Sequence, residues 1–139
     1  MKYLLDTCAI SDLRKPECPE SLRQLIETTD DTALFLSAVT LGEIQKGVSL
    51  LPAGKRRQEF QAWLAFVQSS FDDRILPVTA ETALIWGQIT ARCQQAGHTL
   101  HSSDGLIAAT AIQFGLHLVT RNISDFEPTG ALIINPWLD

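Results

Sequence analysis

The stretch KYLLDT, residues 2–7, opens the chain with a short apolar run that ends at an acidic residue. Residues 3–5 have the length and composition of a buried β-strand, and the polar pair Asp6-Thr7 ends it. Short apolar runs of this kind return along the whole chain. The further strand candidates are residues 34–36, 75–76 with Val78, 118–119 and 132–134.

Longer stretches with a helical spacing of apolar residues lie between these runs. Apolar residues of 41–51 recur at intervals of three and four, and Pro52-Ala53-Gly54 ends that helix. Residues 106–114 are apolar on nearly all sides, which predicts a buried central helix. Further helices are predicted at 22–26, 60–71 and 85–93. Strands that alternate with helices predict an α/β fold with a central parallel sheet covered on both faces.

Length and composition point to one domain with no membrane segment. The 139 residues are expected to form a single domain over 1–139. No apolar run approaches the ~18 residues of a membrane span, and Asp6 interrupts the first run, so a cytoplasmic location is expected. The three cysteines include no Cys-x-x-Cys pair, which argues against a disulfide framework or a structural zinc site.

Acidic residues stand at three separate boundaries of this pattern. Asp6 ends the first run, Glu43 follows residues 34–36 by about two helical turns, and Asp104 opens the central helix. Thr120-Arg121-Asn122, with Asp125, follows residues 118–119. Because the carboxyl ends of parallel strands face one crevice, these side chains are expected to converge. Carboxylates in one crevice repel each other unless a cation lies among them. The pattern therefore predicts a divalent-metal site and phosphodiester chemistry.

Carboxylate and amide oxygens suit Mg²⁺ or Mn²⁺ rather than zinc. One or two such ions would activate water and stabilise the leaving oxygen of a phosphodiester. The net charge of −5 at first argues against a nucleic-acid partner. Asp6, Glu43, Asp104 and Asp125 account for four of those five units, so metal binding would remove most of the excess.

Each of these residues also has a purely structural explanation. Asp6 or Thr7 could cap a helix, and Glu43 could be a first-turn acid paired with Lys46. Asp104 could cap the central helix, and Asn122 and Asp125 could be turn residues. Their joint placement at one end of the strand–helix units favours a site.

Two other chemistries are less favoured. His98, His101 and Asp104 have a zinc-like spacing, but one helix would have to carry all three, and Gly97 and Ser102-Ser103 indicate a loop. Cys8 has no basic residue beside it in sequence to activate it as a nucleophile.

Several motifs together resemble the PIN-domain ribonucleases, specifically the VapC/FitB-like toxins of type II toxin–antitoxin modules. They occur in family order and span the whole chain. The matching words are YLLDT at 3–7, SAVTLGEI at 37–44 with Gly47, SDGLIAATA at 103–111, LVTRN at 118–122 with Asp125-Phe126, and NPW at 135–137.

The resemblance implies a three-layer α/β/α sandwich with a central parallel sheet, and a Mg²⁺- or Mn²⁺-dependent endoribonuclease. Asp6, Glu43 and Asp104 match the three family acids, and either Asn122 or Asp125 takes the fourth position. Thr120 would orient a carboxylate or water, and the hydroxyl of Thr7 could hold a ligand.

The partners implied are an RNA substrate, a VapB-type antitoxin and a second copy of the chain in a homodimer. DNA would be bound only through the toxin–antitoxin complex. The predicted reaction is hydrolysis of an RNA phosphodiester, with Arg121 or Lys46 proposed to neutralise phosphate charge.

Two alternatives compete with this hypothesis. A haloacid-dehalogenase-like phosphatase would need a second acid two residues after Asp6, where the chain has Cys8. A catalytically weak or inactive PIN-fold binding module is the other, since Asn122 brings no charge. Neither the RNA nor the antitoxin can be named from the sequence.

Overall fold

The fold alternates short strands with helices, as the apolar pattern predicts. The computed structural model describes residues 1–137. The strands are β1 (Tyr3–Leu5), β2 (Leu34–Ser37), β3 (Ile75–Leu76), β4 (His117–Val119) and β5 (Ile133–Ile134). The helices are α1 (Thr7–Leu13), α2 (Glu20–Thr28), α3 (Ala38–Leu50), α4 (Lys55–Phe71), α5 (Ala80–Gln95), α6 (Ser102–Phe114) and α7 (Ile123–Phe126). The short 3₁₀ turns are η1 (Asp31–Ala33), η2 (Asp72–Arg74) and η3 (Glu127–Thr129).

All five strands are parallel, in the order β3-β2-β1-β4-β5. Leu4 of β1 lies opposite Phe35 of β2 on one side and Leu118 of β4 on the other. The chain builds outward from β1 through β2 to β3, then crosses to the far side of β1 to form β4. The connections therefore diverge beside β1, and ligands of open α/β sheets bind at such a switch point.

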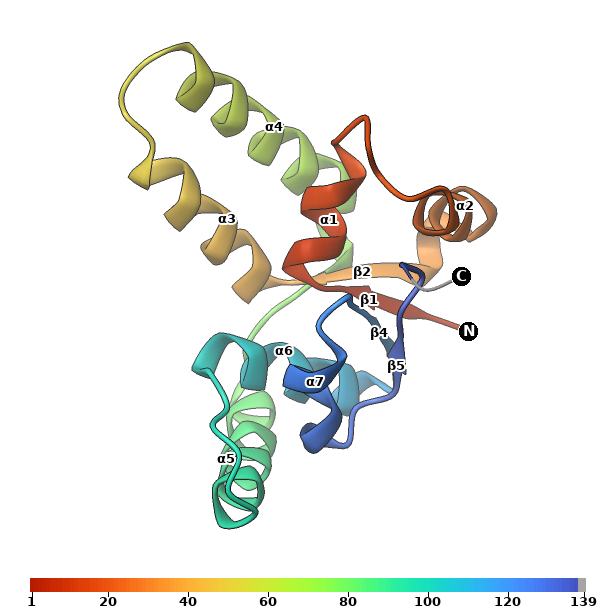
Figure 1. Ribbon diagram of the computed structural model, residues 1–139, viewed down its shortest axis with the longest axis vertical. Coiled ribbons are helices and arrows are strands. Elements are labelled where there is room, and N and C mark those ends of the chain that lie inside the picture. Colours follow the sequence, from red (N-terminus) through yellow and green to blue (C-terminus); the bar gives the residue numbers. More distant parts are fainter. Residues whose placement is uncertain (138–139) are drawn as a thin grey trace.

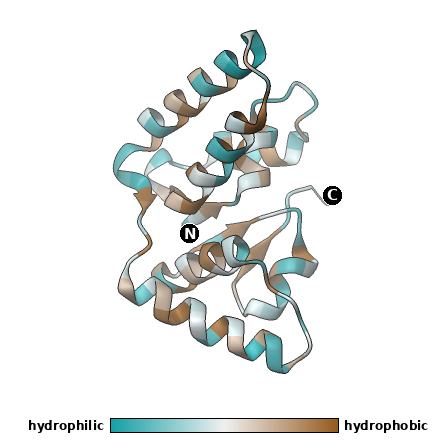
Figure 2. Ribbon diagram, turned by 90° about the vertical axis from the view of Figure 1, so that its left-hand side faces the viewer, coloured by the Kyte–Doolittle hydropathy of each residue, from teal (hydrophilic) through white to brown (hydrophobic). Residues whose placement is uncertain are grey.

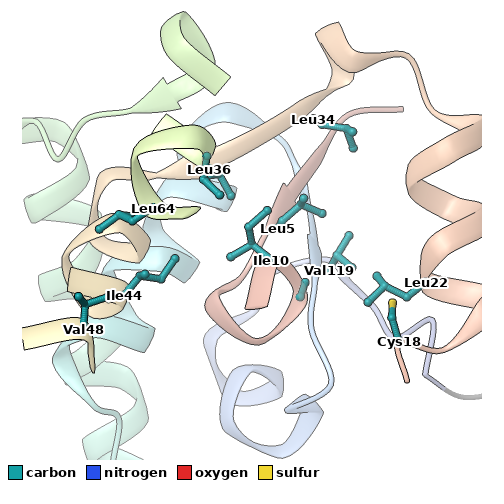
Figure 3. Packing of buried hydrophobic residues seen from close by; sticks show 12 residues of the cluster. Leu5, Ile10, Cys18, Leu22, Leu34, Leu36, Ile44, Val48, Leu64 and Val119 are labelled. Atoms are coloured by element: carbon teal, nitrogen blue, oxygen red, sulfur yellow. The ribbon is translucent and has the colours of Figure 1, made fainter. Parts of the chain in front are cut away.

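Successive strand residues point to opposite faces, and each face has its own hydrophobic core. Leu5, Leu36 and Val119 pack with Ile10 of α1 and Ile44 of α3 on one face. Figure 3 shows these side chains meeting residues of α2 and α4. The other face packs against α6 and α7, through the residues Leu4, Ile107, Ala108, Ala111, Leu118 and Phe126.

The result is the three-layer α/β/α sandwich expected from the sequence. Figure 1 shows α1 to α4 on one side of the sheet and α5 to α7 on the other. In Figure 2 the strands are mainly hydrophobic, whereas the outer helices alternate between hydrophobic and hydrophilic residues. Within residues 1–137, no helix is long and apolar enough to cross a membrane.

Helices α3 and α4 form a helical arm, in which α4 is the helix predicted at residues 60–71. They lie side by side and extend away from the sheet (Figure 1). The side-chain amides of Gln45 and Gln61 exchange two hydrogen bonds of 3.0 Å between them. Leu64 and Val67 of α4 join the core beside Ile44 and Val48.

Some boundaries differ from the sequence prediction. Helices α1 and α7 were not predicted, because each is too short to display a helical repeat of apolar residues over several turns. Val78, predicted in the third strand, lies beyond β3 and is 43% exposed. Leu132 likewise precedes β5 and is exposed.

The predicted central helix, α6, is buried between the sheet and α5. Its residue Ala109 packs with Ile89 and Cys93 of α5. Gly105 allows this close approach, because a Cβ atom at that position would lie 2.7 Å from Cδ1 of Trp86. Contacts on both sides explain why α6 has no polar face.

We expect Gly105→Ala to lower the free energy of unfolding by about 1–3 kcal/mol, because the added methyl group overpacks against Trp86. Gly87→Ala is the matched control in α5, where a Cβ atom meets nothing within 4 Å. That change should stabilise the helix by about 0.5–1 kcal/mol. Urea denaturation of both variants measures the difference, and equal stabilities would contradict this account of the α5–α6 contact.

Candidate active site

Asp6 is held at the carboxyl edge of the sheet by its own backbone and by α1. Its N–H donates to the carbonyl of Val119 in β4 at 3.1 Å. Its carboxylate caps α1, with Oδ1 accepting from the backbone N–H of Ala9 and from Sγ of Cys8, each at 2.9 Å. Only 3% of Asp6 is exposed. The helix-cap explanation is therefore correct for Asp6, and it also fixes the carboxylate at this edge.

Glu43 reaches the same edge from α3. It is the sixth residue of that helix, which Ser37 caps, so the first-turn explanation of Glu43 is wrong. The hydroxyl of Thr7 donates to Oε1 of Glu43 at 2.5 Å. Among residues 1–137, the lysines in ion pairs are Lys15 and Lys55, so the structure has no Glu43–Lys46 pair.

Asp104 is the third residue of α6 and lies in its first turn, and His101 is the N-cap residue. Partial burial is the main cause that raises the pKa of Asp104, and the negative charges of Glu43, Asp125 and Asp6 raise it further. The nearby His101 acts in the opposite direction. The charges of all three other predicted acids therefore act on the pKa of Asp104, although these acids lie at the start of α1, in α3 and in α7.

The loop after β4 supplies the polar cluster of residues 120–122. Thr120 is fully buried, and its hydroxyl accepts a hydrogen bond of 3.0 Å from the backbone N–H of Asn122. Asp125 follows in the first turn of α7. The side chain of Arg121 points away from the acids, since its guanidinium lies 3.4 Å from the carboxylate of Asp12.

Asp6, Glu43 and Asp104 meet with Asn122 around one cavity of about 250 Å³. It is lined by Asp6, Thr7, Cys8, Ser11, Glu43, Asp104, Ile107, Asn122 and Phe126. Of the two candidates for the fourth position, Asn122 lines the cavity and Asp125 does not, although its charge reaches Asp104. Ser11 was not foreseen; its spacing of four from Thr7 would have indicated it had helix α1 been predicted.

Burial and mutual repulsion raise the pKa of acids that line the cavity. Burial is the main cause that raises the pKa of Asp6, and the charge of Glu43 adds to it. Hydrogen bonds from Cys8, Thr120 and the backbone of Ala9 oppose the rise. A cation among the carboxylates would relieve both the burial cost and the mutual repulsion.

The donor set matches a hard divalent cation in its chemistry. Carboxylate, amide and hydroxyl oxygens surround the cavity, and such ligands suit Mg²⁺ or Mn²⁺. In the part of the chain that the structure describes, no three His, Cys, Asp or Glu side chains lie close enough together to hold a metal ion by themselves.

The two less favoured chemistries gain no support. Burial and the neighbouring Asp6 raise the pKa of Cys8 to about 12, so its thiol stays protonated. His98 is exposed in the loop between α5 and α6, and His101 lies at the N-cap of α6. The two histidines and Asp104 are therefore not carried by one helix, as the sequence indicated.

We expect Asp6→Asn to raise the melting temperature of the metal-free chain at pH 7. The pKa of Asp6 is raised above its ordinary 3.8, so the folded state holds the proton more tightly than the unfolded chain. The associated stability is present below pH 3.8 and is lost as the pH rises through the folded pKa. The advantage of Asn should therefore disappear below that pH.

Thermal melts in EDTA from below pH 3.8 to pH 7 test the sign of the change in melting temperature. Asp30→Asn is the control, because Asp30 is exposed and hydrogen bonds from Thr32 lower its pKa. That variant should melt below the wild type at pH 7. A lower melting temperature for Asp6→Asn at pH 7 in EDTA would contradict the account.

Comparison with known proteins agrees with the fold and the motif order. The PIN domain family matches residues 3–129. VapC ribonuclease Y4jK of Sinorhizobium fredii is 37% identical over 96% of each chain. Toxin FitB of Neisseria gonorrhoeae is 34% identical over 98% of this chain and 99% of its own length. A structure of FitAB bound to a DNA fragment superposes with a TM-score of 0.89 at 32% identity, covering 97% of this chain and 95% of the other. The chain therefore belongs to the PIN domain family, within the group that contains the VapC and FitB toxins.

Proposed function

We propose that this chain is the toxin of a VapBC-type toxin–antitoxin system and acts as a metal-dependent endoribonuclease, as a single PIN domain over residues 1–139. The observation that carries the proposal is the convergence of Asp6, Glu43, Asp104 and Asn122 on one cavity at the switch point of the sheet. The similarity to a VapC ribonuclease and to a FitB toxin supports the same activity.

The carboxylates of Asp6, Glu43 and Asp104 are the residues that would hold the ion, with Asn122 or Asp125 as a further ligand. A bound Mg²⁺ or Mn²⁺ supplies Lewis-acid activation of the phosphodiester and of the attacking water. Oδ1 of Asp6 accepts hydrogen bonds from Cys8 and from the backbone of Ala9, which fixes the orientation of this carboxylate beside the cavity. Thr7 orients Glu43 in the same way, through Oε1.

The buried hydroxyl of Thr120 hydrogen-bonds the carboxylate of Asp6 and accepts a hydrogen bond from the N–H of Asn122, which links Asp6 to the loop of residues 120–122. The proposed phosphate role falls to Lys46 rather than Arg121. Lys46 and Glu43 line a cavity next to the acids, whereas the guanidinium of Arg121 contacts Asp12. A lysine at the edge of the acidic cavity would offset phosphate charge without neutralising the carboxylates.

A cognate VapB-type antitoxin would block this site. An apolar groove of about 270 Å³ between α1, α3 and α4 adjoins the acids and shares Thr7, Ser11 and Glu43 with their cavity. Phe60 and Trp63 line it, with the guanidinium of Arg14 4.2 Å from the Phe60 ring centre. A peptide with apolar anchors that lies in this groove would extend over the acids.

The remaining partners follow from the same proposal. DNA is bound by the toxin–antitoxin complex and not by this chain alone, which agrees with the DNA-bound FitAB structure. The chain forms a homodimer in the cytoplasm. Leu84 of α5 and Phe114 of α6 are exposed apolar residues that such an interface would cover.

We expect the purified, antitoxin-free chain to cut a total small-RNA pool into discrete fragments with Mg²⁺ or Mn²⁺ and not in EDTA. Asp6→Asn and Asp104→Asn should each lower the cleavage rate at least about 100-fold, because each removes a charged metal ligand. Gel or sequencing readout of fragment ends measures the rate and identifies the cleavage site.

Asp31→Asn serves as the control, since this exposed acid lies in η1, outside the residues that line the cavity. It should cleave as the wild type does. Equal cleavage by Asp6→Asn would remove the catalytic assignment. No cleavage by a wild type that still binds antitoxin would favour the inactive binding module, for which the uncharged Asn122 is the specific indication.

A further inference from the structure

One face of α1 holds the loop of residues 120–122. Cys8 and Asp12 are four residues apart, so both lie on the same side of this helix. Sγ of Cys8 lies 4.0 Å from the hydroxyl of Thr120, and Oδ2 of Asp12 lies 3.4 Å from Nη1 of Arg121. Cys8 lines the acidic cavity, whereas Asp12 and Arg121 do not.

Asp12 is buried to 7% exposure, yet it lies outside the residues that line the acidic cavity. Its carboxylate accepts from three donors: Nζ of Lys15 at 3.2 Å on Oδ1, and Nη1 of Arg121 at 3.4 Å and Nε1 of Trp137 at 3.1 Å on Oδ2. A buried carboxylate that recruits three donors from three segments is a structural junction.

The C-terminal segment reaches this junction from the sheet. The carbonyl of Ile134 in β5 accepts from the N–H of Thr120 at 3.1 Å. Beyond it, Oδ1 of Asn135 accepts from the N–H of Trp137 at 3.0 Å, and the Ser21 hydroxyl bonds the carbonyl of Pro136. Trp137 then packs against the hydrophobic core on the face of the sheet that α1 to α4 cover. The motif at 135–137 therefore ends on the same carboxylate that holds Arg121.

Consecutive residues of the loop line different cavities. Arg121 lines a cavity with Asp12 and Trp137, whereas Asn122 lines the acidic cavity. Fixing the Arg121 side chain on one side of the loop therefore fixes which way the next residue faces. Arg121 is 54% exposed, so its ion pair with Asp12 adds little to the stability of the fold.

We propose that Asp12 is a positioning residue that acts through Arg121, with Trp137 as its second anchor, to hold Asn122 in the acidic cavity. This inference rests on the proposed function, because Asn122 matters as a ligand only if the cavity binds a metal ion. It also gives Arg121 and the 135–137 motif a role that the proposed chemistry leaves unassigned.

The test measures Mn²⁺ affinity of the full chain without antitoxin, by electron paramagnetic resonance of the free ion, together with kcat and KM for RNA. Asp12→Asn and Arg121→Gln should each weaken Mn²⁺ binding about tenfold and lower kcat with little change in KM. Asp12→Glu should restore both. Lys15→Gln, which frees only Oδ1 of Asp12, should match the wild type.

A double-mutant cycle separates positioning from general damage. In an Asn122→Ala background, Asp12→Asn should change Mn²⁺ affinity less than twofold, because the residue it acts on is gone. An unchanged tenfold effect there, or wild-type affinity and kcat in both Asp12→Asn and Arg121→Gln, would overturn the inference. The exposed Arg121 is the variant to rely on if Asp12→Asn does not fold.

Failure of the two proposals gives different results. A wild type that binds Mn²⁺ but cuts no RNA overturns the ribonuclease, while the affinity cycle still decides the positioning role. A wild type that binds no Mn²⁺ overturns both, since Asn122 then has no ion to coordinate.

Discussion

The parallel pairing of β1 between β2 and β4 is the constraint on which the rest of the molecule depends. Parallel strands need a crossover between each pair, so helices must cover both faces of the sheet. The same pairing brings every carboxyl end to one edge. The residues that leave β1 and β4 meet there, together with the first turns of α6 and the second turn of α3. The acidic cavity is thus a consequence of the strand order.

This edge confines negative charge in a place that water reaches only partly. Burial raises the pKa of both Asp6 and Asp104, and nearby acids raise it further. The chain offsets part of this cost with fixed donors: the N–H of Ala9 and the thiol of Cys8 on Asp6, and the hydroxyl of Thr7 on Glu43. Each donor takes one oxygen of its carboxylate. These hydrogen bonds fix the orientation of both carboxylates at the edge of the sheet.

Much of the fold was predictable because its signals are local. Residues 3–5, 34–36 and 118–119 were recognised as strands, and the all-round apolar pattern of 106–114 correctly indicated a buried helix. Helix α1 was missed because its seven residues carry a functional surface, with Thr7, Cys8 and Ser11 facing the cavity. The polar residues that make the site also hide the helical period on which prediction relies.

The sequence by itself determined the alternation of strands and helices, the placement of Asp6, Glu43 and Asp104 at element boundaries, and the family motifs in order. Only the tertiary structure decided that Arg121 contacts Asp12 while Asn122 lines the cavity. It also decided that Asp125 raises the pKa of Asp104 through its charge without lining the cavity. The physical reason is that apolar period and chain breaks are local properties. The direction of a side chain in a loop depends on partners far along the chain, here Asp12 and Trp137, which the sequence does not place beside it.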